Sequence, residues 1–144
     1  MIDDESEAEE ELDPHWAQAQ RLAVAAYLSR QRVPHGELPL SPAWHVAPYV
    51  GVWDVPGRTS GERSFWAIAG DLPTDFVSAD TLPNARSAVL ALAERWLAVA
   101  GYMAKGLRHP TISIGSGERS AELASLLQSR ATLLADWARD DELW

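Results

Sequence analysis

The sequence predicts an α+β fold: an N-terminal helix, a small antiparallel sheet of two or three strands, and two long C-terminal helices packed on that sheet. Apolar residues recur at helical spacing in the segments near both ends of the chain. The segment from 44 to 78 is instead rich in aromatic and β-branched residues, which favour strands. Because the two patterns are segregated and do not alternate, helices on an antiparallel sheet are favoured over a parallel α/β fold.

The first 13 residues form a block of negative charge. They hold 8 of the chain's 21 acidic residues and no Lys or Arg, which leaves 13 acidic against 12 basic residues in the rest. Such a block repels itself and buries no apolar surface, so we expect residues 1–12 to be a disordered tail and residues 13–144 to form a single α+β domain. Two roles are open for the tail: it keeps the protein soluble, or it attracts a basic partner.

The first helix is expected over residues 13–32. Asp13 fits the N-cap, and Pro14 fits the first helical position, where its missing N–H costs nothing. Pro34 and Gly36 end the helix, and further prolines follow. They predict an extended connector over residues 33–42, because proline cannot sit in a regular hydrogen-bonded ladder.

The sheet is expected between residues 44 and 78. We predict one strand over 44–55, a hairpin loop that begins at Pro56, and a second strand over 64–70. A turn or bulge over 70–74 then leads to a short third strand over 75–78.

Two helices are expected to follow, over residues 82–105 and from 117 or 119 to 139. Gly106 ends the first of them, and a loop over 107–117 joins the two. Trp144, one of seven tryptophans, lies beyond the last helix, and we expect it to dock on the domain, because an exposed indole gains nothing.

Several residue types and sequence motifs that mark particular classes of function are absent from the sequence. The chain has no Cys, which excludes disulfides, thiolate metal sites and Cys nucleophiles. We see no secretion signal, no membrane-length apolar run, no glycine-rich phosphate loop and no stripe of Lys and Arg. We therefore expect a cytoplasmic protein without a cofactor, a metal site, nucleic-acid binding or membrane binding.

Asp71 and Asp75 are the strongest candidates for chemistry. Two carboxylates can divide general-acid and general-base roles, and together with His45 they could also bind a divalent metal. A structural role is favoured, however, because Asp side chains in turns commonly accept backbone hydrogen bonds. Arg130 interrupts an apolar helix face and is expected to pair with one of the two aspartates, and Arg86 is a second candidate to reach the same loop.

The function that we expect is that of a non-catalytic protein that binds a partner protein, in particular a basic effector or toxin. The binding surface would combine the loop at Asp71 with the neighbouring strand ends. The residues expected there are Asp71, Pro73, Thr74, Asp75, Trp53, Trp66 and Arg86. Two alternatives stay open: a small metal-dependent or carboxylate-based hydrolase that uses Asp71, Asp75 and His45, and a structural subunit of a homo-oligomer.

Several stretches of the chain resemble a family of small bacterial proteins that is known only as a domain of unknown function. The most specific is the block W-x-I-x-G-D-L-P-T-D at residues 66–75. The others are the strand at 46–53, the pairs and runs at 78–79 and 83–86, the helix motif L-L-x-S-R-A at 126–131, and the ending L-W at 143–144. The resemblance covers most of the chain beyond the acidic tail. It implies a similar length and order of elements, and it implies no reaction and no cofactor.

Overall fold

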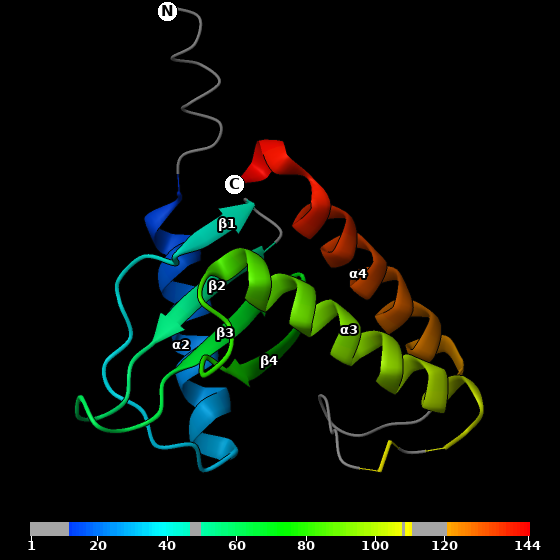
Figure 1. Cartoon of the computed structure of the whole chain (residues 1–144), viewed down its shortest axis with the longest axis horizontal. Helices are drawn as coiled ribbons and strands as arrows, with labels where there is room; N and C mark the ends of the chain where they lie inside the picture. The colour runs from blue at the N-terminus through cyan, green and yellow to red at the C-terminus, as the bar shows by residue number, and fades with distance from the viewer. Residues whose placement is uncertain (1–11, 47–49, 108, 111–120) are drawn as a thin grey trace, which may run out of the picture.

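The computed structural model describes residues 12–46, 50–107, 109–110 and 121–144. Within them it confirms the α+β class, with one helix before the sheet and two after it (Figure 1). The elements in chain order are α2 (Pro14–Arg30), β1 (Trp44–Val46), β2 (Val50–Val55), β3 (Phe65–Gly70), β4 (Leu72–Ser78), α3 (Ala85–Ala104), α4 (Ala121–Arg139) and the short 3-10 helix η1 (Asp141–Leu143). The predicted disorder of residues 1–12 falls almost wholly outside the described residues, as does the predicted loop before α4.

The sheet has four antiparallel strands in the order β1-β2-β3-β4, so the expectation of two or three was wrong. The segment predicted as one strand over 44–55 is two strands, β1 and β2, which pair with each other from Trp44 opposite Val52 to Val46 opposite Val50. β4 begins at Leu72, three residues before the predicted start of its strand. Strand-forming residues occur throughout 44–55, and where such a run folds back on itself is decided by pairing and not by composition.

The sheet lies between α2 on one face and α3 with α4 on the other (Figure 1). Alternate residues of each strand pack on opposite faces of the sheet, because successive side chains of a strand point to opposite sides. Val52 and Ile68 face α3, whereas Trp53 and Ala67 face α2. β2 and β3 are therefore buried on both sides, which explains why they are apolar at almost every position.

Capping side chains fix the first residues of α2 and α3. The Asp13 carboxylate accepts a hydrogen bond of 2.9 Å from the His15 backbone N–H, with Pro14 next in the chain, as predicted. Asn84 and Ser87 form a reciprocal capping box that starts α3. α4 then packs mainly along α3, and small residues line the contact. The buried alanines of the two helices are Ala88, Ala93, Ala100, Ala124, Ala131, Ala135 and Ala138.

Candidate functional site

The structure separates Asp71 from Asp75. Asp71 occupies the tight turn between β3 and β4, just after Gly70, whose φ of 143° disfavours any residue with a side chain. The Asp71 side chain is 71% exposed. Asp75 lies in the middle of β4 opposite Ile68 and is 0% exposed. A bulge between these two points adds a residue to β4, so the two carboxylates do not share one loop.

Asp75 is held by three groups on two elements. Its Oδ2 accepts from Arg95 Nε and from the Trp96 indole Nε1, both at 2.8 Å, and its Oδ1 accepts from the Phe76 backbone N–H at 2.9 Å. A buried carboxylate needs such partners, since removal from water without them costs several kcal/mol. Asp75 therefore links β4 to α3. Its hydrogen-bonding capacity is largely taken up within the fold.

Tyr27 on α2 lies within the electrostatic reach of Asp75. Burial raises the pKa of Tyr27 above its ordinary value of 10.0, and the negative charge of Asp75 raises it further. The Tyr27 ring also meets the Phe76 ring edge to face, with centroids 6.2 Å apart. The hydroxyl of Tyr27 thus stays protonated to a higher pH in the folded protein than in the unfolded chain.

This difference predicts a loss of stability in alkali. The folded state keeps the Tyr27 proton where the unfolded state has lost it, so the contribution is intact below the unfolded pKa of 10.0 and is lost as pH rises toward the folded pKa. Urea unfolding between about pH 9 and pH 11 should show a steeper fall of stability for the parent protein than for Tyr27→Phe, which keeps the ring contact. Identical slopes for the two proteins would contradict the assignment.

Arg130 pairs with Asp71, one of its two predicted partners. Arg130 Nε donates to the Asp71 backbone carbonyl at 3.0 Å, and its Nη2 lies 3.7 Å from the Asp71 carboxylate. Both side chains are partly in solvent, so the ion pair itself contributes about 0–1 kcal/mol. It connects α4 to the β3–β4 turn.

The three candidate catalytic residues do not converge. His45 lies on β1 and pairs with Gly51, so it faces α2, whereas Asp75 faces α3. β1 and β4 are the two outer strands of the sheet, about 14 Å apart at the usual strand spacing. Within the described parts of the chain, no group of three or more His, Asp or Glu side chains could hold a metal ion.

The tryptophans expected at the binding surface belong to the core. Trp53 is 0% exposed beneath α2, and its indole Nε1 has no hydrogen-bond partner among the described residues. Trp66 is buried on the opposite face of the sheet, where its Nε1 donates to the Leu82 carbonyl at 2.9 Å. The surface predicted from the sequence is corrected accordingly: Asp71 is exposed, while Pro73 and Thr74 are half-buried on β4.

Arg86 reaches the end of the chain and not the aspartate turn. Its Nε donates to the Ala138 carbonyl at 2.7 Å, and its Nη2 binds the Asp141 carboxylate at 2.6 Å. The guanidinium also lies over the Trp144 ring, 6.0 Å from the centroid. Arg86 therefore satisfies a carbonyl in the last turn of α4, where a cation is favourable.

Trp144 docks on the domain as predicted. Its ring stacks on Trp44 at a centroid distance of 4.3 Å, and its Nε1 donates to the Trp137 carbonyl at 2.9 Å. In return, Trp44 Nε1 donates to the Leu143 carbonyl at 3.1 Å. We call Trp44, Arg86, Trp137, Asp141 and Trp144 the C-terminal clasp, because they fasten the last residues to β1 and α3. The abundance of tryptophan hinted at such a cluster, but the sequence could not pair its members.

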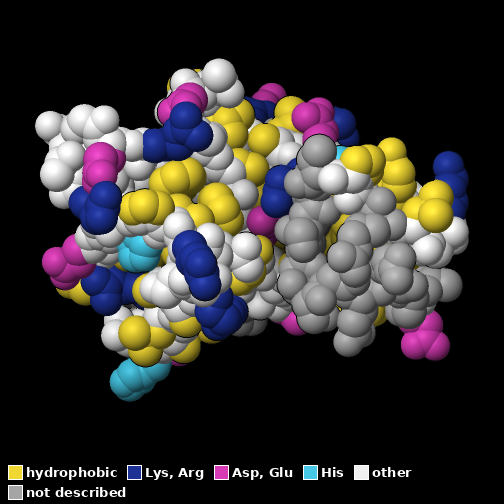
Figure 2. Space-filling model, turned by 90° about the horizontal axis from the view of Figure 1, so that it is seen from below, with side chains coloured by type: hydrophobic (Ala, Val, Ile, Leu, Met, Phe, Trp, Pro, Cys, Tyr) yellow, Lys and Arg dark blue, Asp and Glu magenta, His cyan; other side chains and the backbone are white. Residues whose placement is uncertain are grey.

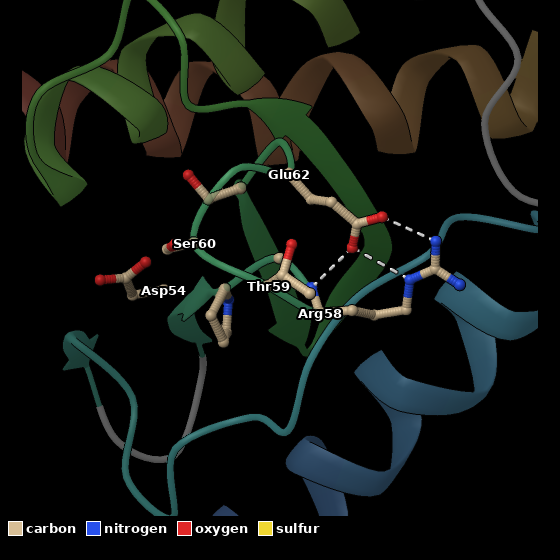
Figure 3. Close-up of a pocket in the computed structure, with 8 residues that line it drawn as sticks. Asp54, Arg58, Thr59, Ser60 and Glu62 are labelled. Carbon is tan, nitrogen blue, oxygen red and sulfur yellow. Dashed lines mark hydrogen bonds and ion pairs between the residues drawn. The ribbon is translucent and has the colours of Figure 1, made fainter.

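A shallow hollow of about 430 Å³ lies at the β2–β3 loop (Figure 3). Hydroxyl and carboxylate groups line much of it, among them Asp54, Thr59 and Ser60. Glu62 binds Arg58 through both of its oxygens, and this hydrogen bonding holds the pKa of Glu62 below its usual value. Glu62 is thus ionised, and both of its oxygens accept hydrogen bonds from Arg58, so it is poorly suited to act as an acid.

Exposed apolar side chains are spread over the surface. Figure 2 shows one face, on which hydrophobic side chains appear in several groups with Lys and Arg side chains between them. The large exposed hydrophobic residues are Leu22, Leu40, Leu97, Tyr102, Leu107, Leu126 and Leu133. No described helix is apolar over a length sufficient to cross a membrane.

The fold and the candidate site define a small α+β protein in which a four-stranded antiparallel sheet is covered on both faces and most of the candidate polar residues stabilise the fold. The particular family is shown by a comparison with family models. The model described as Domain of unknown function (DUF4826) matches residues 10–144, so the chain belongs to this family. No curated protein and no solved structure gives a significant match.

Proposed function

We propose that this protein is a non-catalytic binding protein whose partner is a basic protein, such as an effector or toxin that it neutralises or regulates. The observation that carries the proposal is a group of exposed carboxylates at one end of the molecule that form no ion pair with a described residue. Six arginines form ion pairs within the fold, and each pair neutralises one carboxylate together with one cation. The paired arginines are Arg21, Arg58, Arg63, Arg86, Arg95 and Arg130.

Acidic residues gather at one end of the molecule. Asp136, Asp140 and Glu142 are exposed near the end of the chain and form no ion pair with a described residue. α2 begins at the same end (Figure 1), and the acidic segment 1–13 of the sequence leads into it. The exposed cation Arg139 lies among them in the sequence, so three exposed carboxylates stand beside one exposed cation. A net negative field of this kind accelerates the approach of a cationic surface and repels nucleic acid. A cytoplasmic location is part of the same proposal, in line with the absence of Cys.

The sheet edges give less support to a homo-oligomer built by strand pairing. β1 has only three residues. On β4, Pro73 has no N–H to offer, and the Phe76 N–H is already bonded to the Asp75 carboxylate. Short strands, prolines, bulges and local charges are the usual means by which proteins prevent edge-to-edge pairing.

Co-purification from native lysate tests the proposal. The full chain should retain a basic protein in stoichiometric amount, and the chain that starts at Leu12 should retain it more weakly. Raising salt from about 0.05 M to 0.5 M should release it, because screening shortens the reach of exposed charges. Failure of both versions to retain any partner at low salt would overturn the proposal.

A further inference from the structure

The outward face of α4 carries an ordered row of exposed residues. Glu122, Leu126, Ser129, Leu133 and Asp136 follow one another at alternating steps of four and three, which places them along one side of the helix. All five are exposed, and Leu126 and Leu133 are 50% and 38% exposed. The buried residues of α4, such as Leu127 and Leu134, occupy the side that packs on α3. We call the five residues the α4 outer row.

We infer that the α4 outer row is a docking surface for a cationic amphipathic helix of the partner protein. This inference rests on the proposed function and assigns its surface. The row has a leucine on each side of Ser129 and a carboxylate at each end, and a helix with leucine-like residues on one face and Lys or Arg beside them matches it in both respects. From Glu122 to Asp136 the α4 outer row spans about 21 Å at the usual rise of 1.5 Å per residue, so about four turns of a partner helix would cover it.

The neighbouring cation does not oppose such a partner. Arg130 lies beside the row, between Leu126 and Leu133 along the helix. Its guanidinium is bonded to the carbonyl and close to the carboxylate of Asp71, so its charge is directed toward the β3–β4 turn and partly compensated. Beyond Asp136, the exposed residues Arg139 and Asp140 carry one positive and one negative charge, so this end of the row keeps the negative charge of Asp136.

Charge also argues against other occupants. In an antiparallel pair of two copies, Glu122 of each would lie near Asp136 of the other, and a parallel pair would place each acid beside itself. Like charges that face each other in this way are destabilising. An anionic lipid surface or a nucleic acid would be repelled by the same carboxylates.

The test measures binding of a synthetic peptide of about 18 residues, made of Leu and Lys with all leucines on one helical face. A scrambled peptide of the same composition is the matched probe. Fluorescence anisotropy would be followed with the full chain and with Leu126→Ser/Leu133→Ser, Glu122→Gln/Asp136→Asn and the control Leu22→Ser. Leu22 is 57% exposed on α2, across the sheet from α4. Thermal unfolding of each variant checks that it is folded.

We expect the amphipathic peptide to bind the parent protein and Leu22→Ser alike, and to bind the leucine double variant about tenfold more weakly or worse, since each leucine loses apolar contact. The charge variant, which changes no apolar contact, should also bind more weakly. Equal binding of both peptides to all variants, lost only on removal of residues 1–11, would overturn the docking surface and leave the proposed function standing. If neither peptide binds any form at low salt, both are overturned.

Discussion

Replacing Asp75 with alanine should lower the free energy of unfolding by about 3–5 kcal/mol, the usual cost of breaking a buried ion pair from one side. The substitution leaves the Trp96 indole N–H and the Phe76 N–H without their acceptor. It also leaves the Arg95 guanidinium without its carboxylate, although Arg95, at 25% exposure, keeps partial access to water. Urea unfolding followed by tryptophan fluorescence would measure the loss.

Asp71→Ala is the matched control for Asp75→Ala. It removes a carboxylate from the same turn-and-strand segment, but one that is 71% exposed, so we expect a change below about 1 kcal/mol. A double replacement, Asp75→Leu with Arg95→Met, should recover only the part of the loss that comes from the unpaired Arg95 cation, because the Trp96 and Phe76 N–H groups still lack their acceptor. Equal small losses for Asp75→Ala and Asp71→Ala would refute the structural assignment of Asp75.

Trp144→Ala should destabilise the protein by about 2–3 kcal/mol. The estimate combines the loss of a stacked indole pair, about 0.5–1.5 kcal/mol, with the loss of the hydrogen bond to the Trp137 carbonyl and of apolar contact. Trp44 fluorescence should shift to longer wavelength as its stacked face becomes exposed. Thermal unfolding would report the change in stability.

Two controls separate the C-terminal clasp from general surface effects. Trp144→Phe keeps one aromatic ring but loses the N–H donor and part of the stacked area, so about half of the destabilisation should remain. Leu40→Ala alters a side chain that is 75% exposed and should change stability by less than about 0.5 kcal/mol. If Trp144→Ala is as mild as Leu40→Ala, the clasp does not stabilise the fold.

The conspicuous polar and aromatic residues of the sequence have unequal roles in the structure. The Gly-Asp-Leu-Pro-Thr-Asp block suggests a shared site because its two carboxylates lie four residues apart. One of them is an exposed turn residue and the other is a buried anchor, because the bulge and the strand pairing at Ile68 carry Asp75 inward. The closeness of Asp71 and Asp75 in the sequence therefore does not place them in one functional site.

The sequence contains one signal for the role of Asp75. If β4 extends through Asp75, then Asp75 and Val77 face the same side of the sheet. Arg95 precedes Trp96, a buried residue of α3, and is a cation within reach of a carboxylate that faces inward from β4. The predicted strand began only at Asp75, which placed the aspartate next to the predicted turn and not in the middle of a strand.

The sequence by itself determined the α+β class, the order of helix, sheet and two helices, the cap at Asp13 and the docking of Trp144. These depend on local signals: the period of apolar residues, capping side chains and the cost of exposing an indole. The tertiary structure decided that residues 44–55 form two strands, that Asp75 binds Arg95 and Trp96, and that Arg86 holds the end of the chain. Such contacts join residues that are distant in the sequence, and their geometry depends on strand register and helix packing, which no local pattern specifies.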